Sequence, residues 1–145
     1  MEIYTIGFTK KSAEQFFGTL TKVGIKRLID IRLNNSSQLA GFTKQDDLAF
    51  FLREICGVEY THQLILAPTK EILDGYKKKT ITWDEYERRF IDLLTERRVE
   101  QVLDKGLFTV PTVLLCSEPK PARCHRRLTA EYLRSKWGNV DIRHL

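Results

Sequence analysis

The chain has no apolar run approaching the roughly 20 residues that a membrane-spanning helix needs, although 42% of its 145 residues are hydrophobic. Residues 1–6 enter strand-like sequence directly, without the basic segment and apolar core of a secretion signal. Only three cysteines are present, an odd number that is unsuited to a secreted disulfide framework and that suits a reducing compartment. We therefore expect a cytoplasmic protein with no membrane partner.

Internal repeats, low-complexity tracts and domain linkers are also lacking. A chain of 145 residues fits one domain with a proper hydrophobic core. Charged residues make up 30% of the sequence, a share typical of a globular protein. The net charge of +5 favours anionic partners such as phosphates, nucleotides or nucleic acid, but it does not say where the charge lies.

Short apolar runs alternate with amphipathic segments along the chain. The predicted strands are residues 3–7, 28–31, 58–61, 112–116 and 140–145. The predicted helices are residues 13–23, 44–56, 83–106 with a break near 97–98, and 122–137. This order predicts a single three-layer α/β domain over residues 1–145, with a mostly parallel sheet of about five strands flanked by helices.

Capping signals mark the starts of three of these helices. Ser12 with Gln15, and Thr82 with Glu85, have the spacing of a capping box. Thr43 is predicted to cap the second helix. The face that this helix would bury is Leu48, Phe51, Leu52 and Ile55. The stretch 63–79 is ambiguous, because residues 64–66 fit either a strand or a packed loop and the lysines at 77–79 fit a solvated turn.

Polar or glycine residues follow three of the predicted strands. Gly7 and Thr9 come at the end of the first strand, Asp30 and Arg32 at the end of the second, and Cys116 at the end of the fourth. Because the carboxyl ends of parallel strands share one edge of the sheet, where ligands bind, these residues could line one cleft. Gly7 would let the backbone approach a ligand or would simply permit a tight turn.

The role of Arg32 is open between two interpretations. Asp30 and Arg32 are two residues apart on a strand and therefore point to the same face, so they could pair with each other. Alternatively, the planar fork of Arg32 could clamp a carboxylate or a phosphate. Thr9 could add a hydroxyl to the same ligand.

Residues 116–126, here called the 116–126 turn, lead from the fourth strand into the last helix. A helix N-terminus attracts anions, so cationic side chains there indicate a negative partner, either a ligand or Glu118 itself. We expect Arg32, Arg123 and Arg126 to hold an anionic ligand. The expected catalytic residues of this turn are Cys116 or Cys124 as nucleophile and Glu118 and His125 as acid–base groups.

The cysteines of the turn allow four interpretations. A thiolate nucleophile is favoured at a helix N-terminus, but six residues separate Cys116 from Arg123, whereas phosphatase and sulfurtransferase loops have five. Zinc could bind Cys116, Cys124 and His125, with Glu118 or His62 as fourth ligand. The two cysteines could also form a catalytic or regulatory disulfide, or be small buried side chains.

Basic clusters occur at residues 77–79, 88–89, 97–98 and 120–127. They could contact phosphates of a nucleic acid. They are scattered, mixed with acidic residues, and match no known recognition motif. A non-catalytic nucleic-acid- or protein-binding module is therefore the alternative to an enzyme for a small anionic molecule. The residues predict no particular cofactor and no oligomeric state.

Four short motifs resemble a bacterial and archaeal family described as domain of unknown function 488. They are Thr5-Ile-Gly7, Asp30-Ile-Arg32, Cys116-Ser-Glu118 and Cys124-His-Arg126, in that order. Phe8 and Thr9 stand where that family usually has histidine and serine. The resemblance implies an α/β fold and one site built from these motifs, and it implies no particular reaction.

Overall fold

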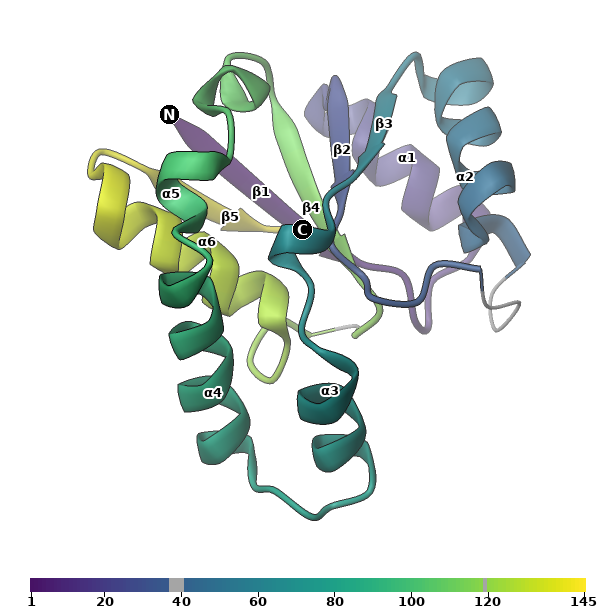
Figure 1. The fold of residues 1–145 in the computed structure, drawn as a ribbon. Coiled ribbons are helices and arrows are strands. Elements are labelled where there is room, and N and C mark those ends of the chain that lie inside the picture. Colours follow the sequence, from purple (N-terminus) through teal and green to yellow (C-terminus); the bar gives the residue numbers. More distant parts are fainter. Residues whose placement is uncertain (37–40, 119) are drawn as a thin grey trace.

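The computed structural model describes residues 1–36, 41–118 and 120–145, and it has a five-stranded sheet at its centre (Figure 1). The strands are β1 (Glu2–Gly7), β2 (Arg27–Asp30), β3 (Glu59–His62), β4 (Thr112–Cys116) and β5 (Asp141–His144). Their order is β3-β2-β4-β1-β5, and each neighbouring pair is parallel. The prediction of an α/β domain with a five-stranded, mostly parallel sheet is confirmed.

Helices cover both faces of the sheet, which gives the three expected layers. The α-helices are α1 (Ala13–Val23), α2 (Gln45–Phe51), α3 (Lys70–Lys77), α4 (Trp83–Glu96), α5 (Val99–Val102) and α6 (His125–Trp137). A π-helix, η2 (Leu52–Cys56), continues α2. Three 3₁₀-helices complete the set: η1 (Gly41–Thr43), η3 (Leu64–Leu66) and η4 (Lys105–Phe108). None of the helices in the described part of the chain is long and apolar enough to cross a membrane.

The core consists of two clusters, one on each face, and β4 contributes to both. Val113 and Leu115 pack in the cluster that contains the buried residues of α1 and α2. Leu114 and Cys116 pack in the other cluster, with α4 and α6. This alternation follows from the two-residue period of a strand. It places Cys116 on the face where α6 begins.

The connections leave the neighbouring strands β1 and β4 for opposite faces. The chain passes from β1 into α1 on one face and from β4 into α6 on the other (Figure 1). Crevices for ligands form at such points, outside the carboxyl ends of the strands. The helical hairpin of α3 and α4 projects beyond the sheet (Figure 1).

Several helix boundaries agree with the capping signals. Ser12 and Gln15 form the complete capping box, whereas Thr82 and Glu85 form only one of its two bonds, in which the Thr82 side chain accepts from the backbone of Glu85. Gly24 ends α1 in the left-handed conformation. The predicted break after α4 is at Arg98, which has a φ of 52°.

The expectations for the second helix were wrong in two respects. Thr43 is buried at the end of η1 and does not cap α2; the N-cap position is Lys44, whose side chain makes no capping bond. Ile55 is 59% exposed, although Leu48 and Leu52 are buried as predicted. Ile55 lies in the π-helical turn, where the 3.6-residue repeat used to assign the buried face does not hold.

The ambiguous stretch 63–79 contains a helix that the sequence pattern did not reveal. Residues 64–66 form η3, and Thr69 caps α3, a helix of only eight residues. Such a helix is too short to show a clear hydrophobic period. The last helix also begins later than predicted, at His125 and not near residue 122, because Cys124 has the extended backbone of an N-cap.

Candidate functional site

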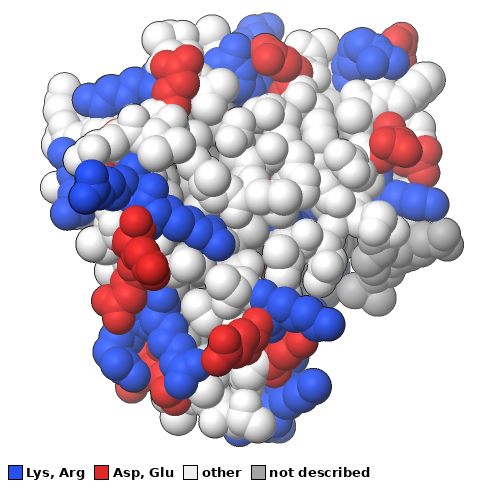
Figure 2. All heavy atoms as spheres, viewed as in Figure 1, with Lys and Arg blue, Asp and Glu red and all other residues white. Residues whose placement is uncertain are grey.

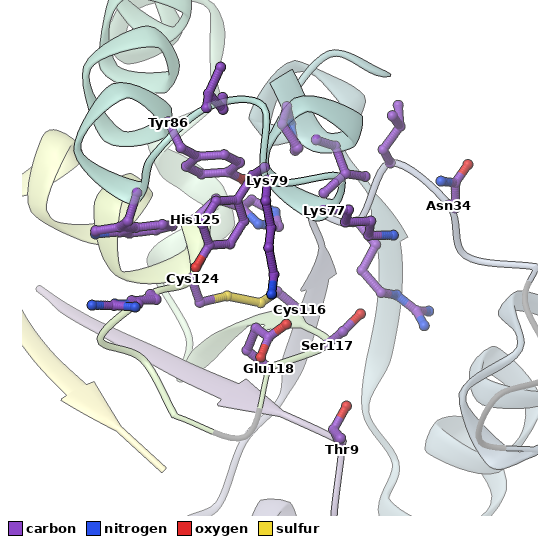
Figure 3. Close-up of a pocket in the computed structure, with 18 of the residues that line it drawn as sticks. Thr9, Asn34, Lys77, Lys79, Tyr86, Cys116, Ser117, Glu118, Cys124 and His125 are labelled. Atoms are coloured by element: carbon purple, nitrogen blue, oxygen red, sulfur yellow. A yellow bond between two sulfur atoms is a disulfide. The ribbon is translucent and has the colours of Figure 1, made fainter. Parts of the chain in front are cut away.

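A pocket of about 820 Å³ lies at the carboxyl edge of the sheet (Figure 3). Its floor comes from residues that follow β1, β2 and β4 and from the start of α6, and its wall comes from α3, α4 and the turn between them. The cationic residues of the lining are Arg32, Lys77, Lys79 and Arg123, and its one acidic residue among those described is Glu118. The pocket therefore offers an excess of positive charge.

Aromatic side chains form much of the wall. The rings of Trp83 and Tyr86 are stacked with their centroids 4.9 Å apart, and the Tyr76 ring lies 5.5 Å from Trp83 and 5.4 Å from Tyr86. Burial raises the pKa of the Tyr86 hydroxyl, with smaller contributions from Tyr76 and Glu118, so this hydroxyl stays protonated near neutral pH. The wall combines flat apolar surface with a hydroxyl of fixed protonation.

Two cysteines meet in the floor of the pocket, where Cys116 and Cys124 form a disulfide. Figure 3 shows this bond in the middle of the lining, with Lys79 pointing toward it and Ser117 and Glu118 close by. Lys79 has a φ of 60°, a conformation that residues other than glycine seldom adopt. The backbone of the α3–α4 turn thus directs this lysine into the pocket.

His125 lies beside the cysteines in a buried and uncharged state. Its Nε2 lies 2.7 Å from the carbonyl oxygen of Ile31, and because a carbonyl can only accept, Nε2 is the donor of this hydrogen bond. Burial, with a smaller contribution from the charge of Arg126, lowers the pKa of His125 to about 4, and the hydrogen bond to Ile31 opposes this shift. A histidine with so low a pKa is a poor proton acceptor at neutral pH.

Arg126 does not line the pocket but lies beneath it, fully buried. Its guanidinium donates to the backbone carbonyl of Glu118 and to Oγ1 of Thr5, and its Nη1 lies 3.8 Å from Sγ of Cys116 and 3.9 Å from Sγ of Cys124. Desolvation lowers the pKa of Arg126 to about 10, and the charge of Glu118 opposes this shift. The side chain is therefore a cation at neutral pH, and it connects β1, the 116–126 turn and the sulfur atoms.

Gly7 is needed for this arrangement because the turn passes directly over it. A Cβ at residue 7 would lie 1.6 Å from the carbonyl oxygen of Glu118 and 2.5 Å from Nη1 of Arg126. Thr9 donates its backbone N–H to Ser117 and holds the same turn from the other side. Gly7 thus accommodates the protein's own turn, and Thr9 lines the pocket.

Asp30 and Arg32 form a buried ion pair. Nε and Nη2 of Arg32 each lie 2.8 Å from a different carboxylate oxygen of Asp30, and Nη2 also donates to the carbonyl of Thr43. Tyr60 donates to the same carboxylate, and the Arg32 guanidinium lies 5.3 Å from the centre of the Phe8 ring. Most of the N–H groups with which Arg32 could bind a ligand are therefore engaged in hydrogen bonds within the protein.

The structure brings most of the predicted site residues together. Those that line the pocket are Thr9, Arg32, Cys116, Glu118, Arg123, Cys124 and His125. Gly7, Asp30 and Arg126 lie behind this lining and support it. The sequence interpretation missed the contribution of α3 and α4, although Lys77 and Lys79 were visible in it as a basic turn.

A metal ion could bind only part of the set considered from the sequence. In the described ranges, Cys116, Cys124 and His125 are the one group with ligand atoms within 4.8 Å of one another. His62 is not part of it, because its two ring nitrogens contact the Arg32 carbonyl and the Asn35 side chain. Zinc would need both cysteines as thiolates, so metal binding and the disulfide exclude each other.

The fold and the pocket define an α/β protein with a crevice at the carboxyl edge of a parallel sheet. The chain belongs to the family described as "Domain of unknown function DUF488", whose model matches residues 12–133. This range includes Asp30-Ile-Arg32 and the whole 116–126 turn. No curated protein and no solved structure matches the chain.

Replacement of Gly7 tests the close approach of the turn. Gly7→Ala should lower the free energy of unfolding by at least about 2 kcal/mol, because the new methyl group overlaps the backbone of Glu118. The matched control is Gly18→Ala within α1, where nothing lies within 4 Å and a gain of about 0.5–1 kcal/mol is expected. Urea denaturation measures both variants. Equal effects at the two positions would contradict this account.

The buried ion pair should contribute strongly to stability once one partner is removed. Asp30→Ala leaves the Arg32 charge buried without its carboxylate and should cost about 3–5 kcal/mol of unfolding free energy. Arg53→Gln, which breaks an exposed pair with Glu54, should cost less than about 1 kcal/mol. The double variant Asp30→Ala/Arg32→Met should recover part of the loss. A similar small cost for Asp30→Ala and Arg53→Gln in chemical denaturation would show that the pair is not buried as described.

The lowered pKa of His125 predicts a specific dependence of stability on pH. The unfolded chain takes up a proton near the ordinary value of 6.5, whereas the folded protein does so only near 4. The free energy of unfolding should therefore fall as the pH decreases from 6.5 to 4, by up to about 3 kcal/mol. Urea titrations across this range should show a shallower fall in His125→Gln. Parallel curves for the two proteins would exclude a buried neutral His125.

Proposed function

We propose that this protein is an enzyme that binds a small anionic molecule, with a phosphate or carboxylate group, in the pocket at the carboxyl edge of the sheet. The observation that carries the proposal is the charge of the lining, where Lys77, Lys79 and Arg123 face a single carboxylate. No salt bridge involves these three side chains within the described residues. Their charge is therefore available for a ligand.

The aromatic wall supports a ligand that also carries a flat apolar group. The stacked rings of Trp83 and Tyr86 offer a surface of the kind that binds heterocycles and other planar groups. A nucleotide combines such a ring with phosphate, and an aromatic acid combines it with a carboxylate. The pocket volume of about 820 Å³ is within the range of small-molecule sites.

The chemical groups of the pocket differ in the roles that they can take. Glu118 is exposed at the pocket, where it can exchange protons with bound ligand and solvent. His125 is held neutral and bonded to Ile31, which suits an orienting role more than proton transfer. Cys116 and Cys124 provide the nucleophilic or redox chemistry. A cytoplasmic location, where such thiols are kept reduced, is part of this proposal.

A nucleic-acid-binding role has less support, because arginines from three of the four basic clusters make contacts within the protein. Arg89 and Arg127 form ion pairs with glutamates of α4 and α6, and Arg97 donates to three carbonyls near η3. Figure 2 shows basic and acidic side chains interspersed on this face of the molecule. A binding surface for a polyanion would need basic side chains that face solvent together.

Binding of matched anionic and neutral compounds tests the proposal. The fluorescence of Trp83 can be followed in a Trp137→Phe background, with adenosine 5′-monophosphate against adenosine and phenyl phosphate against phenol. The anionic member of a pair should bind at least about tenfold more tightly, a difference of about 1.4 kcal/mol. Arg123→Gln should reduce this preference, and Lys26→Gln, remote at the opposite end of β2, should preserve it.

Two outcomes would contradict the proposal. One is equal binding of the charged and neutral members of both pairs, together with no effect of Arg123→Gln. The other is tight binding of mixed oligonucleotides that weakens steeply with salt, which would favour the nucleic-acid-binding alternative.

A further inference from the structure

We propose that Cys116 and Cys124 form a redox-active dithiol/disulfide pair that exchanges with small anionic thiols and disulfides in the pocket. The inference rests on the proposed function, from which it takes the negative charge of the reacting thiol or disulfide. It goes beyond that function because it names the reaction. It starts from one juxtaposition: the disulfide, whose two cysteines are only 1% and 3% exposed, forms part of the lining of a positively charged pocket. A disulfide that a ligand can reach is open to attack by a thiolate.

The surroundings of the two sulfur atoms stabilise negative charge on sulfur. The guanidinium of Arg126 is within 3.9 Å of both sulfurs and is held there by its bonds to Thr5 and Glu118. Cys124 is in addition the N-cap residue of α6, a helix of 13 residues whose first N–H groups and dipole favour an anion. These groups stabilise the thiolates that disulfide cleavage releases.

The position of Cys124 also determines which of the two sulfur atoms the incoming thiolate attacks. A sulfur whose thiolate is better stabilised is the better leaving group. Attack is therefore expected at Sγ of Cys116, and the electron pair of the broken bond moves to Sγ of Cys124. The new bond joins the sulfur of the incoming thiol to Cys116 as a mixed disulfide.

A second anionic thiolate completes the reaction. It attacks the sulfur of the first thiol in the mixed disulfide, forms a small-molecule disulfide and releases Cys116 as a thiolate. In total, two thiolates are oxidised to one disulfide, and the protein disulfide gains two electrons and becomes two thiolates. The reverse reaction reduces an anionic disulfide at the expense of the protein dithiol.

The pocket predicts which thiols react well. Lys79 points toward the disulfide (Figure 3), and Arg123, which immediately precedes Cys124 in the sequence, also lines the pocket. An incoming thiol with a carboxylate or sulfonate is attracted by these cations, whereas one with an ammonium group is repelled. The charge of the incoming thiol, and not only its reactivity, should therefore determine the rate of exchange.

The test compares three thiols of different charge on the oxidised protein. 2-Mercaptoethanesulfonate, 2-mercaptoethanol and cysteamine are reacted at equal thiolate concentration, and mixed disulfides are counted by intact mass spectrometry after acid quenching. The Cys56→Ser background removes the one other cysteine. Each rate is divided by the rate of the same thiolate with an uncharged small disulfide, so that only the influence of the protein remains.

The normalised rate should be at least about tenfold higher for the sulfonate than for cysteamine at low salt, and the difference should shrink in concentrated salt. Lys79→Gln/Arg123→Gln should bring the two rates together, whereas Lys26→Gln should leave them unchanged. In the reduced protein, rapid alkylation by iodoacetamide should persist in Cys116→Ser and be lost in Cys124→Ser.

Three results would overturn the inference. One is the absence of any mixed disulfide while the anionic ligands still bind in the fluorescence titration, which would leave the proposed function intact. Another is exchange at a rate that does not depend on the charge of the thiol. If, in addition, no anionic ligand binds in the fluorescence titration, the proposed function is contradicted together with the inference. The third is purified protein that holds one zinc ion per chain with Cys116 and Cys124 unreactive, which would identify a metal site.

Discussion

The buried guanidinium of Arg126 is the interaction on which the site depends. An arginine out of contact with water is stable only when its donors are satisfied. Here the partners include Thr5 on β1, the Glu118 carbonyl in the 116–126 turn and the two cysteine sulfurs. One side chain from α6 thus joins the first strand of the chain to the turn after β4. The shape of the pocket floor follows from that connection.

This connection explains why residues so different in chemistry occur together. Gly7 has no side chain because the carbonyl that Arg126 binds occupies that space. The same contacts place Cys116, at the end of β4, against Cys124, at the start of α6. The cationic lining residues Lys77, Lys79 and Arg123, with Arg126 beside the sulfurs, leave the pocket positive in spite of Glu118. The positive charge of the pocket and the cation beside the disulfide therefore lie in the same part of the fold.

The two buried arginines of the site, Arg32 and Arg126, differ in their partners, and the pattern of charges in the sequence does not show this difference. Arg32 is matched by Asp30 two residues away, in a pair that the strand geometry brings to one face. Its field is largely cancelled, and its role is to hold the loop after β2 against Thr43 and Phe8. Arg126 instead acts on the sulfur atoms, so its charge bears on the chemistry of the pocket.

The sequence by itself determined the α/β class, the five strands and the edge where the strand ends meet, because these depend on local periodicity and on the direction of parallel strands. It also located the 116–126 turn. Only the tertiary structure decided which side chains line the pocket and which lie behind that lining and support it. That assignment depends on contacts across the fold, such as Arg126 with Thr5, and on the α3–α4 hairpin, whose short first helix has too weak a local signal to be predicted.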